Sequence, residues 1–199
     1  MHLAPLSPLP AGSVAAALTD IGAEITATLG AVADSGLGSE LDRAADELLR
    51  ARRVFLLGAG RSGLALRMTA MRLMHLGLTA HVVGDATAPA IESGDLLLVA
   101  SGSGTTPGIV HAAETASGVG ASVVAITADA ASALALASTV AVVVPAARKL
   151  DRDSAASAQY AGSLFEQSVV VVGDALFHAM WKASGLSADD LWPRHSNLE

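Results

Sequence analysis

The fold of this chain is indicated by residues 54–63, which read Val54-Phe55-Leu56-Leu57-Gly58-Ala59-Gly60-Arg61-Ser62-Gly63. The four apolar residues have the length and composition of a buried β-strand, and the glycines that follow permit a tight turn. Residues 61–77 then carry apolar side chains at helical spacing. A buried strand that turns directly into a helix is the repeating unit of an α/β fold with a parallel sheet.

The rest of the chain repeats this strand-then-helix pattern. Further apolar runs of strand length lie at residues 80–83, 96–100, 122–127 and 140–144. We expect helices at residues 106–118 and 131–137, and a short turn near Pro89. The spacing of the runs, roughly 15 to 25 residues, fits right-handed β-α-β crossovers. The sequence therefore predicts a three-layer α-β-α sandwich around a five-stranded parallel sheet, of flavodoxin-like or Rossmann-like type.

Helical segments flank the predicted sheet in the sequence. Ser13 and Ser39 are suited to begin two N-terminal helices, and a long helix from about residue 159 to 185 precedes a short terminal one. Because we find no internal repeat, we expect one domain over residues 1–199. Its predicted parts are a loose arm at 1–12, N-terminal helices at 13–51, the sheet core at 53–145 and C-terminal helices at 159–199.

The composition excludes several classes of protein. The 199 residues are 52% hydrophobic and 16% charged, which is typical of a packed soluble domain and unlike a disordered chain. With 0 cysteines, disulfides, thiolate catalysis and cysteine-ligated zinc are excluded. The 6 histidines and 19 acidic residues form no metal-ligand motif such as H-E-x-x-H, so no metal site is predicted.

Charge and targeting signals narrow the choice further. A net charge of −7 without any run of Lys or Arg argues against a nucleic-acid partner. The first residues lack the features of a signal peptide, so we expect a cytoplasmic protein. The apolar stretch 163–181 contains Glu166, Asp174 and His178, which favours a buried helix over a membrane span.

The glycine-rich loop after the first predicted strand admits two interpretations. Its glycines at 58, 60 and 63 match the G-x-G-x-x-G pattern of dinucleotide-binding folds. Asp85 follows about 22 residues later, where such folds place an acid that binds the ribose. The same glycines also serve simply to pack a helix tightly against a strand. A nicotinamide dinucleotide site is therefore one possibility and plain packing is another.

A second loop favours a phosphorylated sugar over a dinucleotide. Ser101-Gly102-Ser103-Gly104-Thr105-Thr106 follows the third predicted strand and opens a helix. Glycine backbone N–H groups, a helix N-terminus and hydroxyl donors together form a cradle for one phosphate group. A dinucleotide has no obvious use for this second loop, whereas a sugar phosphate uses both. The alternative is an ordinary turn with a Ser or Thr helix cap.

Five motifs, in the same order, resemble those of the 6-phospho-3-hexuloisomerases, which belong to the sugar isomerase domain proteins. The resemblance runs from about residue 40 to the C-terminus. The motifs are Gly58-Ala59-Gly60-Arg61-Ser62, Met71-Arg72-Leu73-Met74-His75-Leu76-Gly77, Ser101-Gly102-Ser103-Gly104, Gly162-Ser163-Leu164-Phe165-Glu166 and Arg194-His195-Ser196-Asn197-Leu198-Glu199.

This resemblance implies a reaction and an assembly. The reaction is the conversion of D-arabino-3-hexulose 6-phosphate to fructose 6-phosphate, a step of formaldehyde fixation in the ribulose monophosphate pathway. No cofactor or metal is implied. The family assembles as homotetramers with sites at subunit interfaces, and its activity is functionally coupled to 3-hexulose-6-phosphate synthase.

The chemistry requires one base and donors to a negatively charged oxygen, because a ketone moves from C3 to C2 through a cis-enediol. We expect Glu166, at the head of a long apolar helix, to be that base, although a first-turn acid also simply complements the helix dipole. The resemblance implies that His195 reaches an active site, its own subunit's or a neighbouring one's, either to move protons between O2 and O3 or to open the sugar ring. The predicted substrate-binding residues are Gly60, Arg61, Ser62, Ser101, Gly102, Ser103, Gly104, Thr105 and Thr106.

Some positions depart from the family pattern, and other functions remain open. Thr105 stands where many members carry Glu, Tyr160-Ala161 replaces Pro-Met, and Ser196 replaces Ala. The alternatives are a non-catalytic sugar-phosphate-sensing domain, a different aldose–ketose phosphosugar isomerase and a nucleotide-dependent oxidoreductase. A sensor of this type usually carries a DNA-binding module, and the roughly 50 residues before the first strand are not basic.

Overall fold

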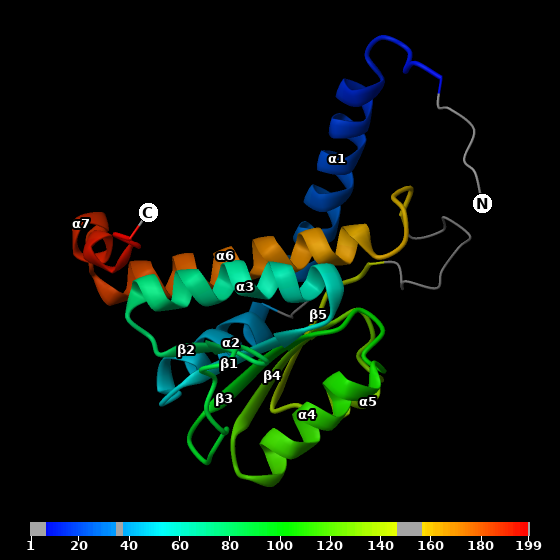
Figure 1. Ribbon diagram of the computed structural model, residues 1–199. Coiled ribbons are helices and arrows are strands. Elements are labelled where there is room, and N and C mark those ends of the chain that lie inside the picture. The colour runs from blue at the N-terminus through cyan, green and yellow to red at the C-terminus, as the bar shows by residue number, and fades with distance from the viewer. Residues whose placement is uncertain (1–6, 35–37, 147–156, 199) are drawn as a thin grey trace.

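A parallel sheet of five strands forms the centre of the computed structural model, which describes residues 7–34, 38–146 and 157–198 (Figure 1). Its strands lie in the order β2-β1-β3-β4-β5, and every neighbouring pair is parallel. Their bounds are β1 Val54–Gly58, β2 Ala80–Val82, β3 Leu96–Ala100, β4 Ser122–Thr127 and β5 Val140–Val143. The predicted fold class and all five predicted strands are confirmed.

The register of the sheet brings the two predicted loops together. Gly58 at the end of β1 pairs with Ala100 at the end of β3, and Ala100 pairs in turn with Ile126 of β4. Strand β2 lies on one side of β1 and strand β3 on the other, so the direction of winding reverses between β1 and β3. Ligands of open α/β sheets bind at such a reversal, at the carboxyl ends of the strands.

Helices cover both faces of the sheet (Figure 1). Alternate strand residues point to opposite faces: Leu56 and Leu98 pack with helices α2, α3 and α6, whereas Phe55 and Leu97 pack with helix α4. The bounds are α1 Ser13–Asp34, α2 Gly38–Arg50, α3 Gly60–Leu76, α4 Pro107–Gly118, α5 Ala133–Leu136, α6 Ser163–Ser184, α7 Ala188–Leu191 and a 3-10 turn η1 Trp192–Arg194.

Helices α3 and α6 lie side by side with their N-terminal ends together (Figure 1). A glycine makes this close approach possible: a Cβ atom at Gly173 would lie 2.1 Å from the Oγ1 atom of buried Thr69. Helix α1 instead projects from the body, and only Thr28 and Val32 of its side chains are buried. The stretch 163–181 is helical, as predicted, and one face of it is buried in the core.

The late helix begins at Ser163, so the predicted start near residue 159 is wrong. Residues 157–162 are held in a different conformation by Glu24 of α1. The Glu24 carboxylate accepts hydrogen bonds from the Ala158 N–H at 2.7 Å, from the Gln159 side chain at 2.9 Å and from the Ser157 hydroxyl at 2.8 Å. Because the Ala158 N–H, above all, donates to it, the pKa of Glu24 is lowered.

Other differences are local. The chain near Pro89 forms no helical turn, although turns flank it at residues 83–87 and 93–94. Helix α5 is shorter than predicted. Ser132 is its N-cap residue, and the Ser132 hydroxyl accepts a hydrogen bond from the Ala135 N–H, so the helix begins at Ala133. Residues 1–6, the first half of the predicted arm, lie outside the described residues.

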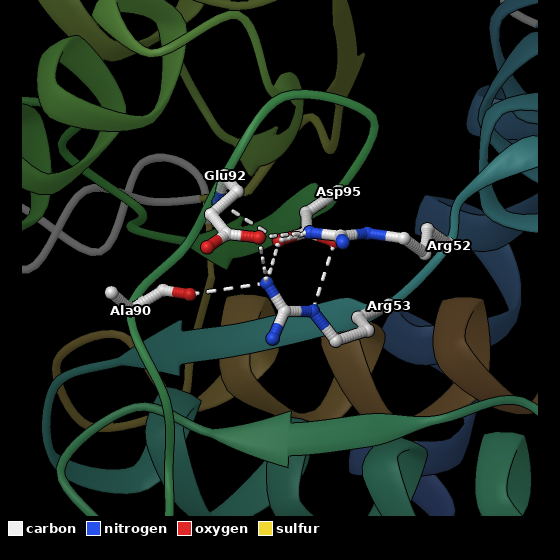
Figure 2. Close-up of polar contacts among 5 residues, drawn as sticks. All are labelled: Arg52, Arg53, Ala90, Glu92 and Asp95. Carbon is white, nitrogen blue, oxygen red and sulfur yellow. Dashed lines mark hydrogen bonds and ion pairs between the residues drawn. The ribbon is translucent and has the colours of Figure 1, made fainter.

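A cluster of charged side chains lies at the amino-terminal ends of β1 and β3, at the end of the sheet opposite the two loops (Figure 2). Asp95, whose side chain is fully buried, accepts hydrogen bonds from Arg53 at 2.6 Å and from Arg52 at 3.1 Å. Burial alone would raise the pKa of Asp95, but hydrogen bonds from Arg53, the Glu92 N–H and Arg52 outweigh it and lower the pKa to about 2. This cluster fastens the segment before β3 to the start of β1, away from the two glycine-rich loops.

Candidate active site

A pocket opens where the loops after β1 and β3 meet the N-terminal end of α6. Three helices, α3, α4 and α6, begin around it, so several helix dipoles favour a negative charge there. The pocket lies at the predicted carboxyl edge of the sheet. Its lining residues are Ala59, Ser62, Ala100, Ser101, Gly102, Ser103, Thr106, Gly162, Phe165 and Glu166.

The loop after β3 is a compact cluster of hydroxyl groups. The Ser101 and Thr106 hydroxyl oxygens lie 3.1 Å apart, and the Thr105 N–H and hydroxyl both donate to Ser103 Oγ. Thr106 is the N-cap residue of α4, yet its side chain makes no capping hydrogen bond. Thr106 thus occupies the cap position that the turn-and-cap alternative predicts, but its hydroxyl contacts Ser101 of the cluster.

A glycine with left-handed backbone geometry shapes this loop. Gly104 has φ of +60°, and a Cβ atom there would lie 2.1 Å from the Ser132 hydroxyl oxygen. Its N–H donates to the Ser101 carbonyl and its own carbonyl accepts from the Leu134 N–H. No other residue fits without displacing Ser132, so Gly104 fixes the curvature that gathers the hydroxyl groups.

The glycines of the loop after β1 have two different roles. Gly58 and Gly63 pack strand against helix, because a Cβ atom at Gly63 would lie 2.4 Å from the Gly58 carbonyl oxygen. Gly60 has φ of +58° and faces open space. The packing interpretation therefore holds for two of the three glycines. Asp85 forms an ion pair at 2.9 Å with Arg67 on the exposed side of α3 and does not line the pocket.

Glu166 lies in the first turn of α6 at the rim of the pocket, with 18% of its side chain exposed. Its Oε2 atom is 3.0 Å from Nη1 of Arg61, the second residue of α3. The same Arg61 nitrogen donates to the Ser163 hydroxyl at 3.0 Å. A carboxylate and a guanidinium thus meet beside the hydroxyl cluster, which places a potential base and an oxyanion donor at one opening.

His195 lies at the far end of α3. Its ring stacks on the His75 ring at a centroid distance of 3.9 Å, and His75 is in the last turn of α3. Ser62, which lines the pocket, is in the first turn, so the two places are separated by roughly 20 Å along the helix axis. Figure 1 shows the C-terminal segment and the start of α6 at opposite ends of the α3–α6 pair. Within one copy, His195 does not reach the pocket.

The other predicted site residues lie in or beside the pocket. Six line it: Ser62, Ser101, Gly102, Ser103, Thr106 and Glu166. Gly60, Gly104 and Thr105 shape the two loops, and Arg61 contacts Glu166. Within the described residues, no group of three or more His, Asp or Glu side chains is placed to hold a metal ion.

A family model described as the SIS domain matches residues 47–171, which include both loops and the start of α6. The chain belongs to the SIS domain family. A 3-hexulose-6-phosphate isomerase of Mycobacterium gastri is 56% identical over 155 residues, which are 78% of each chain. One from Bacillus subtilis (strain 168) is 36% identical over 161 residues, 80% of this chain and 87% of that protein.

A solved structure supports the same relationship. The crystal structure of a Methanococcus jannaschii protein, for which a molecular function of 3-hexulose-6-phosphate isomerase has been inferred, has a TM-score of 0.78 and 27% identity. The match covers 92% of this chain and 99% of that chain. The SIS domain of this chain therefore has the predicted fold over nearly its whole length.

Phe165, which lines the pocket, and Ser163, which lies beside it, were given no role by the sequence. Phe165 is buried, and its ring lies so close to Gly102 that a Cβ atom there would be 3.2 Å away. Ser163 holds Arg61 by the hydrogen bond described above. Both belong to the motif Gly162-Ser163-Leu164-Phe165-Glu166, which pointed to this region. The contacts of Phe165 with Gly102 and of Ser163 with Arg61 depend on how α6 packs against the two loops, which the sequence alone does not show.

Proposed function

We propose that this chain interconverts D-arabino-3-hexulose 6-phosphate and fructose 6-phosphate through a cis-enediol. One observation carries the proposal: Glu166 and the hydroxyl cluster of residues 101–106 line the same pocket. A cluster of hydroxyls at helix N-termini is suited to a phosphate, and a carboxylate beside it is suited to take a proton from carbon. The names of the relatives from Mycobacterium gastri and Bacillus subtilis support this choice of substrate.

The proposed steps assign one role to each part of the pocket. The phosphate group binds at Ser101, Ser103 and Thr106, and this remote binding aligns C2 and C3 with Glu166. Glu166 removes the proton from C2, and the C2=C3 enediol forms as negative charge develops on the O3 atom. Arg61 stabilises that charge, and a proton then passes from O2 to O3, the transfer that His195 of a second copy would carry. As the C2 carbonyl forms, Glu166 returns its proton to C3.

This mechanism separates Glu166 from Arg61 when substrate binds. Without substrate the two side chains are ion-paired at 3.0 Å. Arg61 is 59% exposed and Ser163 gives it a second anchor, so it has room to turn toward a substrate oxygen. We infer that a bound sugar takes over the Arg61 hydrogen bonds and leaves the Glu166 carboxylate facing C2.

His195 belongs to this mechanism only through a second copy of the chain. We propose that copies pair so that the C-terminal segment of one lies over the pocket of another, in a homotetramer. Apolar side chains on the outer surface of α3, at Leu64, Met68 and Met71, are more than half exposed. Helix α1 also exposes Val14 and Leu18. A second copy would cover these surfaces.

Helix α1 is also long and apolar enough, by length and composition, to cross a membrane. Two features favour a subunit interface instead. Asp20 and Glu24 lie within the helix, and charged groups are costly inside a bilayer. Glu24 also binds residues 157–159, which ties the helix to the body beside the pocket loops. We infer that the protein works in the cytoplasm and receives its substrate from 3-hexulose-6-phosphate synthase.

Exchange of the C3 proton of fructose 6-phosphate in heavy water tests the proposal. We expect NMR to show deuterium entering C3 with the wild-type protein and a loss of at least roughly 10²-fold in the Glu166→Gln variant. Glu114→Gln, which changes an exposed acid on α4, is the matched control and should exchange normally.

Other outcomes of this experiment exclude the proposal in distinct ways. Exchange at C1 identifies an aldose–ketose isomerase on the same scaffold. Intact binding of fructose 6-phosphate with exchange at neither carbon identifies a sensor domain. Normal exchange at C3 in the Glu166→Gln variant retains the reaction and removes Glu166 as its base.

A further inference from the structure

His75 is a buried titratable side chain that the proposed mechanism does not use. It lies in the last turn of α3 and is 4% exposed. Its Nδ1 atom is buried and has no hydrogen-bond partner within residues 7–34, 38–146 and 157–198. A buried polar nitrogen without a partner is costly, so its presence calls for a reason other than simple filling of the core.

The C-terminal segment docks on this histidine at several points. The His195 ring stacks on the His75 ring, with 23° between their planes, and the centroid of the Trp192 ring lies 4.7 Å from that of His195. Arg194 donates to the His75 carbonyl at 3.2 Å, and its guanidinium lies over Gly77, where a Cβ atom would be 3.3 Å from it. The end of α3 is therefore shaped to receive residues 192–195.

The same docking fixes the proton arrangement of His195. Its Nδ1 atom is 3.2 Å from the Trp192 carbonyl oxygen, which only accepts hydrogen bonds. Nδ1 must then carry the hydrogen, and in the neutral ring Nε2 keeps its lone pair. The stack on His75 sets the plane of the ring, so the direction of that lone pair is fixed as well.

We propose that His75 is a positioning residue, whose flat ring sets the orientation in which His195 is presented to the pocket of another copy. This inference rests on the proposed role of His195. A neutral His75 ring suits this role. Burial, and then repulsion from His195 and Arg72, lower the pKa of His75, so it adds no charge beneath His195. His75 therefore contributes a flat ring against which the His195 ring stacks.

Two volume-conserving substitutions separate ring stacking from filling of space. His75→Phe keeps a flat ring and removes the unpartnered nitrogen, whereas His75→Leu fills a similar volume without a ring. We expect His75→Phe to retain kcat within about twofold and His75→Leu to lose roughly 10-fold or more, with KM for fructose 6-phosphate unchanged in both. Leu73→Ala is the control: it creates a cavity at a buried residue of the same helix, so it should lower Tm and leave kcat unchanged.

A double-mutant comparison tests whether His75 acts through His195. In a His195→Ala background, the Phe and Leu variants at position 75 should have equal kcat, because there is no ring left to position. The NMR signals of the His195 ring protons should be shifted upfield by the neighbouring rings in the wild type and in His75→Phe. In His75→Leu they should move toward the values of an exposed histidine.

Three results would overturn the inference. They are an unchanged kcat in His75→Leu, a loss of kcat from His75→Leu that is as large in the His195→Ala background as in the wild-type background, and an upfield shift of the His195 ring protons that keeps its full size in His75→Leu although only the Trp192 ring remains beside them. The proposed role of His195 is tested separately by the His195→Ala variant, and the proposed reaction by exchange at C3. If that variant retains full kcat, His195 has no catalytic role and the inference falls with it, whereas a slow His195→Ala with independent His75 effects overturns the inference alone.

Discussion

The Nη1 atom of Arg61 lies 3.0 Å from Oε2 of Glu166, across the N-terminal ends of two helices that are about 100 residues apart in the sequence. Arg61 follows β1 directly, and Glu166 follows the segment that Glu24 holds in place. The contact therefore joins the sheet, the late helix and the N-terminal helix at one opening. It puts the proposed base and the proposed oxyanion donor within reach of one substrate.

Replacing Arg61 tests the second of these roles. Arg61→Met removes the charge and keeps much of the side-chain length, so we expect kcat/KM to fall by roughly 10²-fold or more because the enediolate loses its donor. Arg61→Lys restores the charge but not the planar set of donors and should recover only part of the loss. Steady-state kinetics measure both.

Arg67→Met is the matched control for this prediction. Arg67 lies on the same helix and pairs with an exposed acid, Asp85, away from the pocket. Its removal should leave kcat/KM unchanged. If Arg61→Met behaves like Arg67→Met, Arg61 does not stabilise the reacting oxygen.

Gly104→Ala should destabilise the hydroxyl cluster and the fold together. The new methyl group would clash with Ser132 and would require a left-handed backbone, which costs about 1–3 kcal/mol. We expect a lower Tm and a higher KM for fructose 6-phosphate. Gly108→Ala, four residues on and facing open space in α4, should keep or raise Tm because alanine favours helix.

Ser101→Ala should weaken substrate binding more than it weakens the fold. Ser101 is 6% exposed, and its hydroxyl bonds with Thr106 inside the cluster. A lost hydrogen bond to a charged phosphate costs about 1.5–3 kcal/mol, so KM should rise roughly 10-fold or more. The increase in Tm caused by inorganic phosphate should shrink in parallel. Ser117→Ala, at the exposed far end of α4, should change neither quantity.

Asp95 should make the protein sensitive to acid. Its pKa is about 2 in the folded chain, below the ordinary value of 3.8, so the folded state binds the proton more weakly than the unfolded state. The resulting stabilisation, about 2 kcal/mol, is fully present above pH 4 and is lost as the pH falls toward 2. Urea unfolding at pH 7, 4 and 3 measures this loss.

Asp95→Asn should flatten that acid dependence and lower stability at pH 7, because Arg53 and Arg52 lose their buried charged partner and keep only the exposed Glu92. Asp85→Asn provides the comparison, since that exposed ion pair contributes at most about 1 kcal/mol. If the free energy of unfolding falls equally with decreasing pH in the wild type and in Asp95→Asn, other carboxylates cause the loss of stability in acid. The cluster at Asp95 lies opposite the pocket, so kcat should be unchanged in both variants at pH 7.

The sequence by itself determined the sheet and the two loops. The strands of this chain are short and mostly apolar, β1, β3 and β4 are largely buried, and glycine, serine or threonine lies at or soon after the end of β1 to β4, so local composition marks them without knowledge of their neighbours. The hydroxyl cluster is likewise a continuous stretch, Ser101 to Thr106, which is why its residues were found from the sequence. Gly104 and Gly60 were found because only glycine adopts their backbone geometry easily.

Only the tertiary structure decided which of these features meet. The contact of Arg61 with Glu166 depends on how α6 returns to the sheet, and the start of α6 depends on the Glu24 carboxylate, which lies more than 100 residues earlier. The separation of His195 from the pocket, and its stack on His75, depend on the length and direction of α3 and α6. Contacts between residues distant in the sequence arise from the packing of whole helices and strands, so local sequence patterns do not predict them.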